Sequence, residues 1–368
     1  MTYNDNEIAI YLFCAQLYRT GTTPLTILEW NAVVKSLANH NLQPKELLKL
    51  TPSELLSILT YASEQQKPRI ARKIDARKKL GISTLELEEM THKGYGIMFR
   101  TEMPAKIKKL TQHYLPAFFY FAGDPNILSQ PLLGVVGARN ATDEELSQTA
   151  VIVEETVPKG MAIISGGAKG VDTVAVETAL KQGGKAIIFP ADGLARWVKK
   201  REIRSYIMNN QLLIMSTQRL EAPFSGAYAM QRNKFIHAPS NAVLVASSKI
   251  SGAKSSGTWE GVQENIKNRW SPIFVLGKSE GVLRLLEEGH AKPFSSIKDF
   301  YINNHNFPLQ KVHFEEKIKA LITLAEKNEL DRKTIEQTFL SMLEQHFEKE
   351  NKQKSNDKHE EQLTIWNS

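Results

Sequence analysis

The segment that most constrains the fold is residues 163–180, IISGGAKGVDTVAVETAL, where an apolar run leads into a glycine-rich loop and then into a helical pattern. Gly166, Gly167 and Gly170 allow positive φ and let a ligand approach the backbone closely. The following helix offers unpaired N–H groups and the positive end of its dipole, and Lys169 adds a charge inside the loop. The segment predicts a strand, loop and helix with a phosphate site, or else a tight turn whose glycines serve geometry alone.

From about residue 131 onward, short apolar runs alternate with helical patterns. Each run is apolar throughout, as in strands that are buried on both faces. Helix start signals lie between them, such as Thr142 with Glu145 three residues later and Thr258 after Gly257. The pattern predicts the α/β class, with a Rossmann-like doubly wound, mostly parallel sheet whose ligands bind at the carboxyl ends of the strands. The expected strands are residues 132–136, 161–164, 186–189, 212–215, 242–246 and 273–276.

The rest of the chain reads as helical or as a charged linker. We expect an N-terminal helical domain over residues 1–95, an extended Rossmann-like domain over 96–300, a helical C-terminal segment over 301–347 and a flexible tail over 348–368. The basic run at 67–79 predicts a helix whose charges face water, or alternatively a helix face that contacts DNA.

Composition narrows the class of function. Lys and Arg total 47 against 40 acidic residues, a net charge of +7, which favours polyanionic partners. The single cysteine, Cys14, excludes a disulfide framework and a thiolate zinc site. The chain lacks HExxH, GxSxG, Walker A and GxGxxG patterns, so we expect no catalytic residues, no metal and no cofactor. The apolar run at 8–15 is too short to span a bilayer, which predicts a cytoplasmic protein without membrane contact.

Three segments in order resemble the DprA/Smf family of bacterial DNA-processing proteins. They are GVVGAR at 134–139, SGGAKGVDTVAVETAL at 165–180, and RNKFI at 232–236 ahead of the run NAVLVAS. Val176 stands where the family has a histidine, Ala138 where it has serine, and Lys234 where it has arginine, so the chain resembles a divergent member. The resemblance implies that residues 1–95 form a SAM-like domain.

The resemblance also implies a function and a site. It implies a non-catalytic protein that binds single-stranded DNA, protects incoming or processed strands, helps to load a RecA-type recombinase in DNA uptake and natural transformation, and forms a homodimer. The implied DNA- or phosphate-binding residues are Gly137, Arg139, Ser165, Gly166, Gly167, Lys169, Gly170, Arg232, Asn233 and Lys234.

The sequence leaves two alternative roles open for each of several candidate site residues. Arg139 is expected to grip a phosphate through two N–H donors, with a structural ion pair to Asp172 as the alternative. Asn233 contacts DNA or ties down its own loop. Phe235 and Trp259 stack on bases or pack in the core.

Two other segments are similar to motifs with different functions. Residues 257–260, GTWE, are similar to the G-T-x-E segment of the cytokinin-activating LOG enzymes, so the alternative function is a nucleotide-binding sensor or a nucleotide-cleaving enzyme, with a role in phage defence. The end of the chain is similar to the Q-L-x-L-F peptide that docks on the bacterial sliding clamp, or it folds back onto its own domain. The residues of this motif are Gln362, Leu363, Ile365 and Trp366.

Overall fold

The computed structural model of the chain describes residues 3–17, 21–78, 80, 84–111, 113–250, 256–298 and 300. Residues up to Phe300 form one compact unit. The helical segment and tail expected over 301–368, with the clamp-like motif at their end, lie outside the described residues.

The N-terminal part is helical, as predicted. Its elements are α1 (Asp5–Cys14), α2 (Ile27–Asn39), the 3-10 helix η1 (Pro44–Leu48), α3 (Pro52–Ile58), α4 (Lys67–Lys78) and α5 (Thr84–His92). Asn4, Thr26 and Thr51 each cap a helix, and the carboxylate of a glutamate three residues later accepts the backbone N–H of the cap residue. These capping boxes fix where the three helices begin.

The basic helix α4 corrects one expectation, because part of its charge faces inward. Arg77 has no exposed surface, and its guanidinium donates hydrogen bonds to the carbonyls of Leu12 and Ala15 at the end of α1. The buried carboxylate of Glu29 forms two ion pairs with α4. Its Oε2 contacts Lys73, and its Oε1 contacts Arg69. Carbonyls at a helix end need donors, and a buried carboxylate needs cations, so these charges hold the N-terminal helices together.

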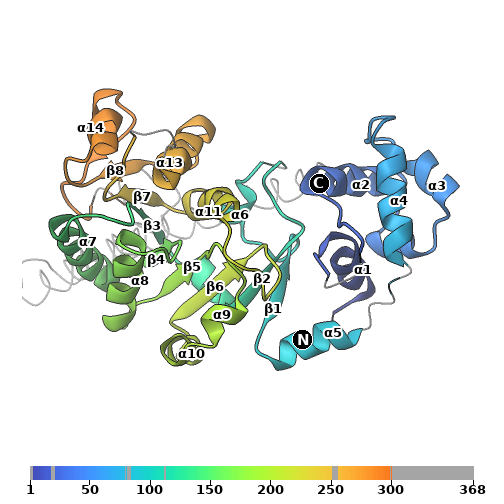
Figure 1. Cartoon of the computed structure of the whole chain (residues 1–368), viewed down its shortest axis with the longest axis horizontal. Coiled ribbons are helices and arrows are strands. Elements are labelled where there is room, and N and C mark those ends of the chain that lie inside the picture. The colour runs from blue at the N-terminus through green and yellow to red at the C-terminus, as the bar shows by residue number, and fades with distance from the viewer. Residues whose placement is uncertain are drawn as a thin grey trace, which may run out of the picture. The chain divides into compact units, whose positions relative to one another are not determined.

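Nine strands of the described residues form one sheet, in the order β1-β2-β6-β5-β4-β3-β7-β8-β9 (Figure 1). From β3 the chain adds strands in one direction to β6 and then returns to place β7 on the other side of β3, with parallel pairing throughout this part. The doubly wound sheet is therefore confirmed. The strands are β1 (Gly96–Phe99), β2 (Phe118–Gly123), β3 (Leu132–Val136), β4 (Ala162–Ser165), β5 (Ala186–Ile188), β6 (Leu212–Ser216), β7 (Ala242–Val245), β8 (Ile273–Val275) and β9 (Lys292–Pro293).

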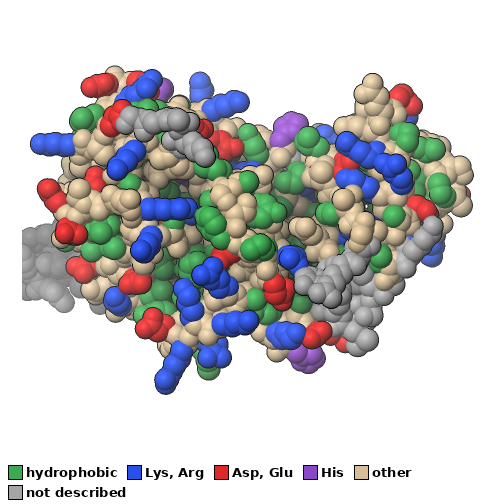
Figure 2. All heavy atoms as spheres, viewed as in Figure 1, with side chains coloured by type: hydrophobic (Ala, Val, Ile, Leu, Met, Phe, Trp, Pro, Cys, Tyr) green, Lys and Arg blue, Asp and Glu red, His purple; other side chains and the backbone are tan. Residues whose placement is uncertain are grey.

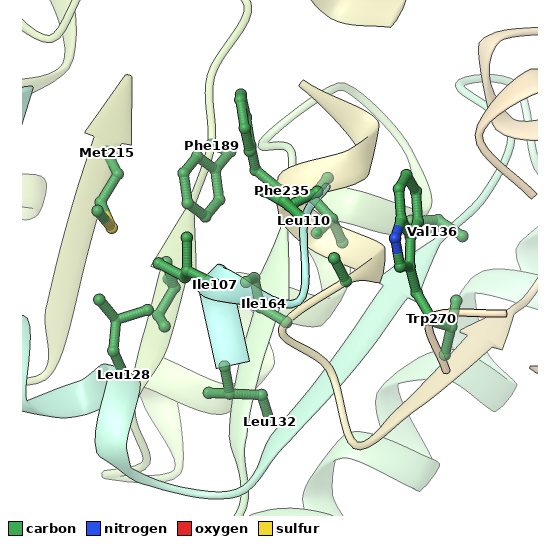
Figure 3. Packing of buried hydrophobic residues seen from close by; sticks show 14 of the residues in the cluster. Ile107, Leu110, Leu128, Leu132, Val136, Ile164, Phe189, Met215, Phe235 and Trp270 are labelled. Carbon is green, nitrogen blue, oxygen red and sulfur yellow. The ribbon is translucent and has the colours of Figure 1, made fainter. Parts of the chain in front are cut away.

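Both faces of this sheet are buried. Ile187 belongs to one hydrophobic cluster and Ile188 to another, because successive side chains of a strand point to opposite faces. Figure 3 shows part of the first cluster, in which Phe189 and Phe235 lie side by side with their ring centroids 5.6 Å apart.

The remaining helices lie between successive strands along the chain. They are α6 (Ala105–Lys108), η2 (Pro125–Ser129), α7 (Asp143–Thr156), η3 (Val157–Lys159), α8 (Val171–Lys181), α9 (Ala195–Val198), α10 (Arg201–Met208), α11 (Gly226–Gln231), α12 (Asn233–His237), α13 (Gly257–Asn268) and α14 (Glu280–Glu287). Thr142 caps α7 and closes a capping box with Glu145, as predicted, whereas α13 is capped by Ser256.

Candidate nucleic-acid interface

A cavity of about 310 Å³ lies at the carboxyl ends of β3, β4, β5 and β6. Among the described residues, five cationic side chains and one carboxylate, Asp192, line it. Figure 2 shows further Lys and Arg side chains gathered over α9 and α10, the two helices that follow the cavity residue Asp192 in the sequence. The cavity is lined by Arg139, Gly166, Gly167, Ala168, Lys169, Ala191, Asp192, Arg196, Trp197, Lys200, Phe224 and Arg232.

The glycine loop forms one wall of this cavity. Gly167 and Gly170 have φ values of 65° and 83°, which other residues rarely adopt, so the expected need for glycine is confirmed at these two positions. The carboxylate of Asp172 in the first turn of α8 accepts the N–H groups of Gly166 (3.2 Å) and Ala168 (3.4 Å). Two amides of the loop thus serve its own fold, because they bind the Asp172 carboxylate.

Arg232 is the central cation of the cavity. Its side chain is only 11% exposed, and its Nη2 lies 3.5 Å from Oδ2 of Asp172. A Cβ on Gly166 would lie 1.1 Å from Nη1, so residue 166 is glycine because the guanidinium lies against its backbone. Nε and Nη1 are buried and have no hydrogen-bond partner among the described residues. Because an unpaired buried donor costs about 1–3 kcal/mol, these donors indicate an anion site.

Burial and charge oppose each other in this pair. Burial lowers the pKa of Arg232, and Asp172 opposes that shift. Burial also raises the pKa of Asp172, against the effect of Arg232 and the two loop amides. An arginine keeps its charge even after such a shift, so the pair remains a cation held over a carboxylate.

Arg139 stands at the opening of the cavity. Its side chain is exposed, and its Cζ lies 5.6 Å from the ring centroid of Phe224, which is itself 53% exposed. The alternative in which Asp172 pairs with Arg139 is wrong, because Asp172 pairs with Arg232. Arg139 and Lys169 therefore offer their charges to solvent or to a ligand.

The wall made by α9 was not predicted from the sequence. Trp197 donates from Nε1 to Asp192 at 2.7 Å, and Lys200 lies with its Nζ 4.8 Å from the Trp197 ring centroid. A Cβ on Gly167 would lie 2.5 Å from this indole, so the glycine loop packs against it. The signal available in the sequence is the basic run RWVKKREIR at 196–204, directly after the strand at 186–189.

Three predicted site residues serve the fold instead. Ser165 is fully buried and donates to the carbonyl of Val135 at 2.6 Å. Asn233 donates to the carbonyl of Gly257 at 2.7 Å, so it ties α12 to the start of α13 and not to its own loop. The carbonyl of Gly137 accepts from Thr258 at 3.0 Å, and this glycine packs against Val171.

The remaining predicted residues do not line this cavity. Lys234 places its Nζ 4.8 Å from the ring centroid of Tyr114, and burial lowers its pKa. Phe235 and Trp259 are core residues that are 5% and 9% exposed, so the packing alternative holds for both.

In the described part of the chain, no three His, Cys, Asp or Glu side chains gather in a way that would hold a metal ion. Among the same residues, no helix has the length and apolar character needed to cross a bilayer.

Known proteins share this architecture and parts of this sequence. A family model of DNA recombination-mediator protein A matches residues 96–305. The DNA processing protein DprA of Streptococcus pneumoniae is 30% identical over 188 residues, which cover 50% of this chain and 65% of that protein. The DprA protein of Bacillus subtilis is 23% identical over 69% of this chain and 80% of its own length. The X-ray structure of S. pneumoniae DprA superposes with a TM-score of 0.63 at 20% identity and covers 83% of this chain and 100% of that chain, so the fold is shared.

Proposed function

The chain belongs to the DNA recombination-mediator protein A family, and we propose that it binds single-stranded DNA without catalysis. In this proposal, successive phosphates of the strand occupy the cavity at the carboxyl ends of β3–β6. The proposal agrees with the net charge of +7 and with the relatives named as DNA processing proteins.

One observation carries this proposal, namely the unpaired guanidinium donors of Arg232. They belong to a buried side chain that lines the cavity together with four further cations, so a phosphate oxygen that reaches them would satisfy both the hydrogen-bonding and the charge requirement. Arg139 and Lys169 at the opening add contacts to the neighbouring phosphates. Because these contacts address the backbone, binding has little sequence preference.

The nucleotide-cleaving alternative finds less support. It requires a carboxylate at the bound nucleotide, and Glu260 of the segment GTWE is not among the described residues that line the cavity. The carboxylate that does line it, Asp192, already accepts a hydrogen bond from Trp197.

The cellular role in this proposal follows from the family. The protein protects incoming or processed strands in the cytoplasm and delivers them to a RecA-type recombinase. It acts as a homodimer, since two linked sites on one strand raise the avidity. Light scattering with and without DNA tests the dimer, and a purified recombinase tests the delivery through its rate of assembly on protein-coated strands.

The clamp contact stays a separate proposal for the tail. A short apolar anchor after a charged linker reaches a groove at low ordering cost. Calorimetric titration of a peptide covering residues 357–368 against the sliding clamp tests it. Loss of binding after Gln362→Ala with Trp366→Ala supports docking, and no binding by the unchanged peptide contradicts it.

The decisive experiment for the main proposal compares labelled single strands, duplexes and mononucleotides over a range of salt concentrations. Each phosphate contact adds about −0.7 to the slope of log affinity against log salt on a single strand. We expect tight, salt-dependent binding of single strands and no release of free base. Equal affinity for a mononucleotide and a long strand, or cleavage of the nucleotide, would favour the sensor or enzyme.

A further inference from the structure

A second cleft of about 150 Å³ adjoins the phosphate cavity. One wall comes from the start of α2 and the residues before it, through Leu25, Ile27 and Trp30. The opposite wall comes from the carboxyl ends of β5 and β6 and from α11 and α12. The N-terminal helices therefore close a site that the sheet alone leaves open.

Arg232 lines both the cleft and the phosphate cavity. A group attached to a phosphate at this guanidinium is thus at the entrance of the cleft. Lys234, which is absent from the phosphate cavity, also lines the cleft and places a second cation beside it. The charge of the cleft suits a segment of a polyanion.

The walls of the cleft combine apolar surface with amide groups. Phe189, Pro190 and Trp30 provide apolar surface, and the side chains of Gln218 and Gln231 provide hydrogen-bond donors and acceptors. An unstacked nucleobase has this same combination, with apolar faces and polar edges. The volume lies below the roughly 300–1,000 Å³ of sites for drug-sized ligands, which favours one base over a larger group.

We propose that this cleft takes up one unstacked base of the strand whose phosphate contacts Arg232, so that the N-terminal helical module forms half of a base site. This inference rests on the proposed binding of single strands. It gives the N-terminal helices a direct part in binding, beyond the phosphate contacts made by the sheet loops.

The test fills the cleft from the side of the helical module. Ile27→Trp places an indole in the cleft, whereas the matched control Leu28→Trp adds the same ring one residue later, at a side chain that is 52% exposed and does not line the cleft. Both variants keep the helix cap at Thr26. Each is measured with an oligothymidylate and with a strand of the same length composed of abasic residues.

We expect Ile27→Trp to bind the oligothymidylate about 5- to 150-fold more weakly than wild type, the range for loss of one base contact. The slope of log affinity against log salt stays unchanged, because no phosphate contact is lost. Leu28→Trp behaves as wild type. The preference of wild type for the natural strand over the abasic strand shrinks in Ile27→Trp by the same factor.

Other outcomes separate the two proposals. If Ile27→Trp binds both strands as Leu28→Trp does, the cleft holds no base, while the phosphate site stands. If wild type itself binds no single strand, the proposed function fails. Should Ile27→Trp unfold, as judged by circular dichroism, the smaller change Gln218→Ala replaces it, and an undiminished preference for the natural strand then overturns the base site.

Discussion

Gly166→Ala tests whether the guanidinium of Arg232 holds a phosphate. The added Cβ would lie 1.1 Å from Nη1 and 1.7 Å from Cζ of Arg232, so the guanidinium must leave its position. The backbone at Gly166 does not have positive φ, so alanine fits its conformation. The substitution therefore displaces the guanidinium while residue 232 itself stays arginine.

The magnitude follows from what the displaced guanidinium loses. A hydrogen bond to a charged group contributes about 1.5–3 kcal/mol, so loss of one phosphate contact lowers strand affinity about 10- to 150-fold. The slope of log affinity against log salt becomes less steep by about 0.7. Stability falls by about 1.5–3 kcal/mol at most, because Asp172 loses its ion pair but still accepts two loop amides.

Fluorescence anisotropy of a labelled oligothymidylate across salt concentrations measures both quantities, and thermal melting measures the stability. Gly226→Ala is the matched control, since nothing lies within 4 Å of a Cβ there. We expect the control to keep the affinity and slope of wild type. A folded Gly166→Ala variant with wild-type affinity and slope would refute the role of Arg232.

Three more predictions follow from exposed and buried charges. Arg139→Ala reduces the slope by about 0.7 while leaving stability within about 0.5 kcal/mol, because the side chain is exposed, and an unchanged slope would show that it contacts no phosphate. Arg77→Ala leaves two carbonyls at the end of α1 without donors and destabilises the protein by about 2–6 kcal/mol in urea unfolding, whereas the exposed Arg72→Ala on the same helix has little effect. Burial lowers the pKa of His237 to about 3, below its unfolded value of about 6.5, so the unfolded state binds the extra proton and stability falls by about 1.4 kcal/mol per pH unit as the pH drops from about 6.5 towards 3. His237→Gln removes this share of the acid sensitivity, and an identical pH profile in the variant would contradict the assignment.

The doubly wound sheet was predictable because its pattern is local. Each of the six expected strands forms within a residue or two of its apolar run, and the glycine loop follows β4 as expected. The strands β1 and β2 were missed, although both belong to the sheet. They pair antiparallel at its edge, outside the alternation of strands and helices that identifies a parallel sheet.

The family was also predictable, because short motifs with glycine and arginine at fixed spacings carry it. The resemblance to DprA/Smf proteins drawn from three segments is confirmed by the family match over residues 96–305. The fold is confirmed by the superposition on S. pneumoniae DprA.

The partners within the site were less predictable, since pairing depends on distances between segments far apart in the chain. An ion pair of Asp172 with Arg139 was the alternative to a phosphate contact, but the structure pairs Asp172 with Arg232, sixty positions away in sequence. The exposed ring beside Arg139 belongs to Phe224 in a loop with no regular pattern, while Phe235, which the motif highlighted, lies in the core.

A crystal structure with a short oligothymidylate tests the central claim most directly. We expect a phosphate of the strand in the cavity, with an oxygen about 2.7–2.9 Å from Nη1 or Nε of Arg232. A strand bound on another face of the protein, with these donors bonded only to water or to protein groups, would contradict it.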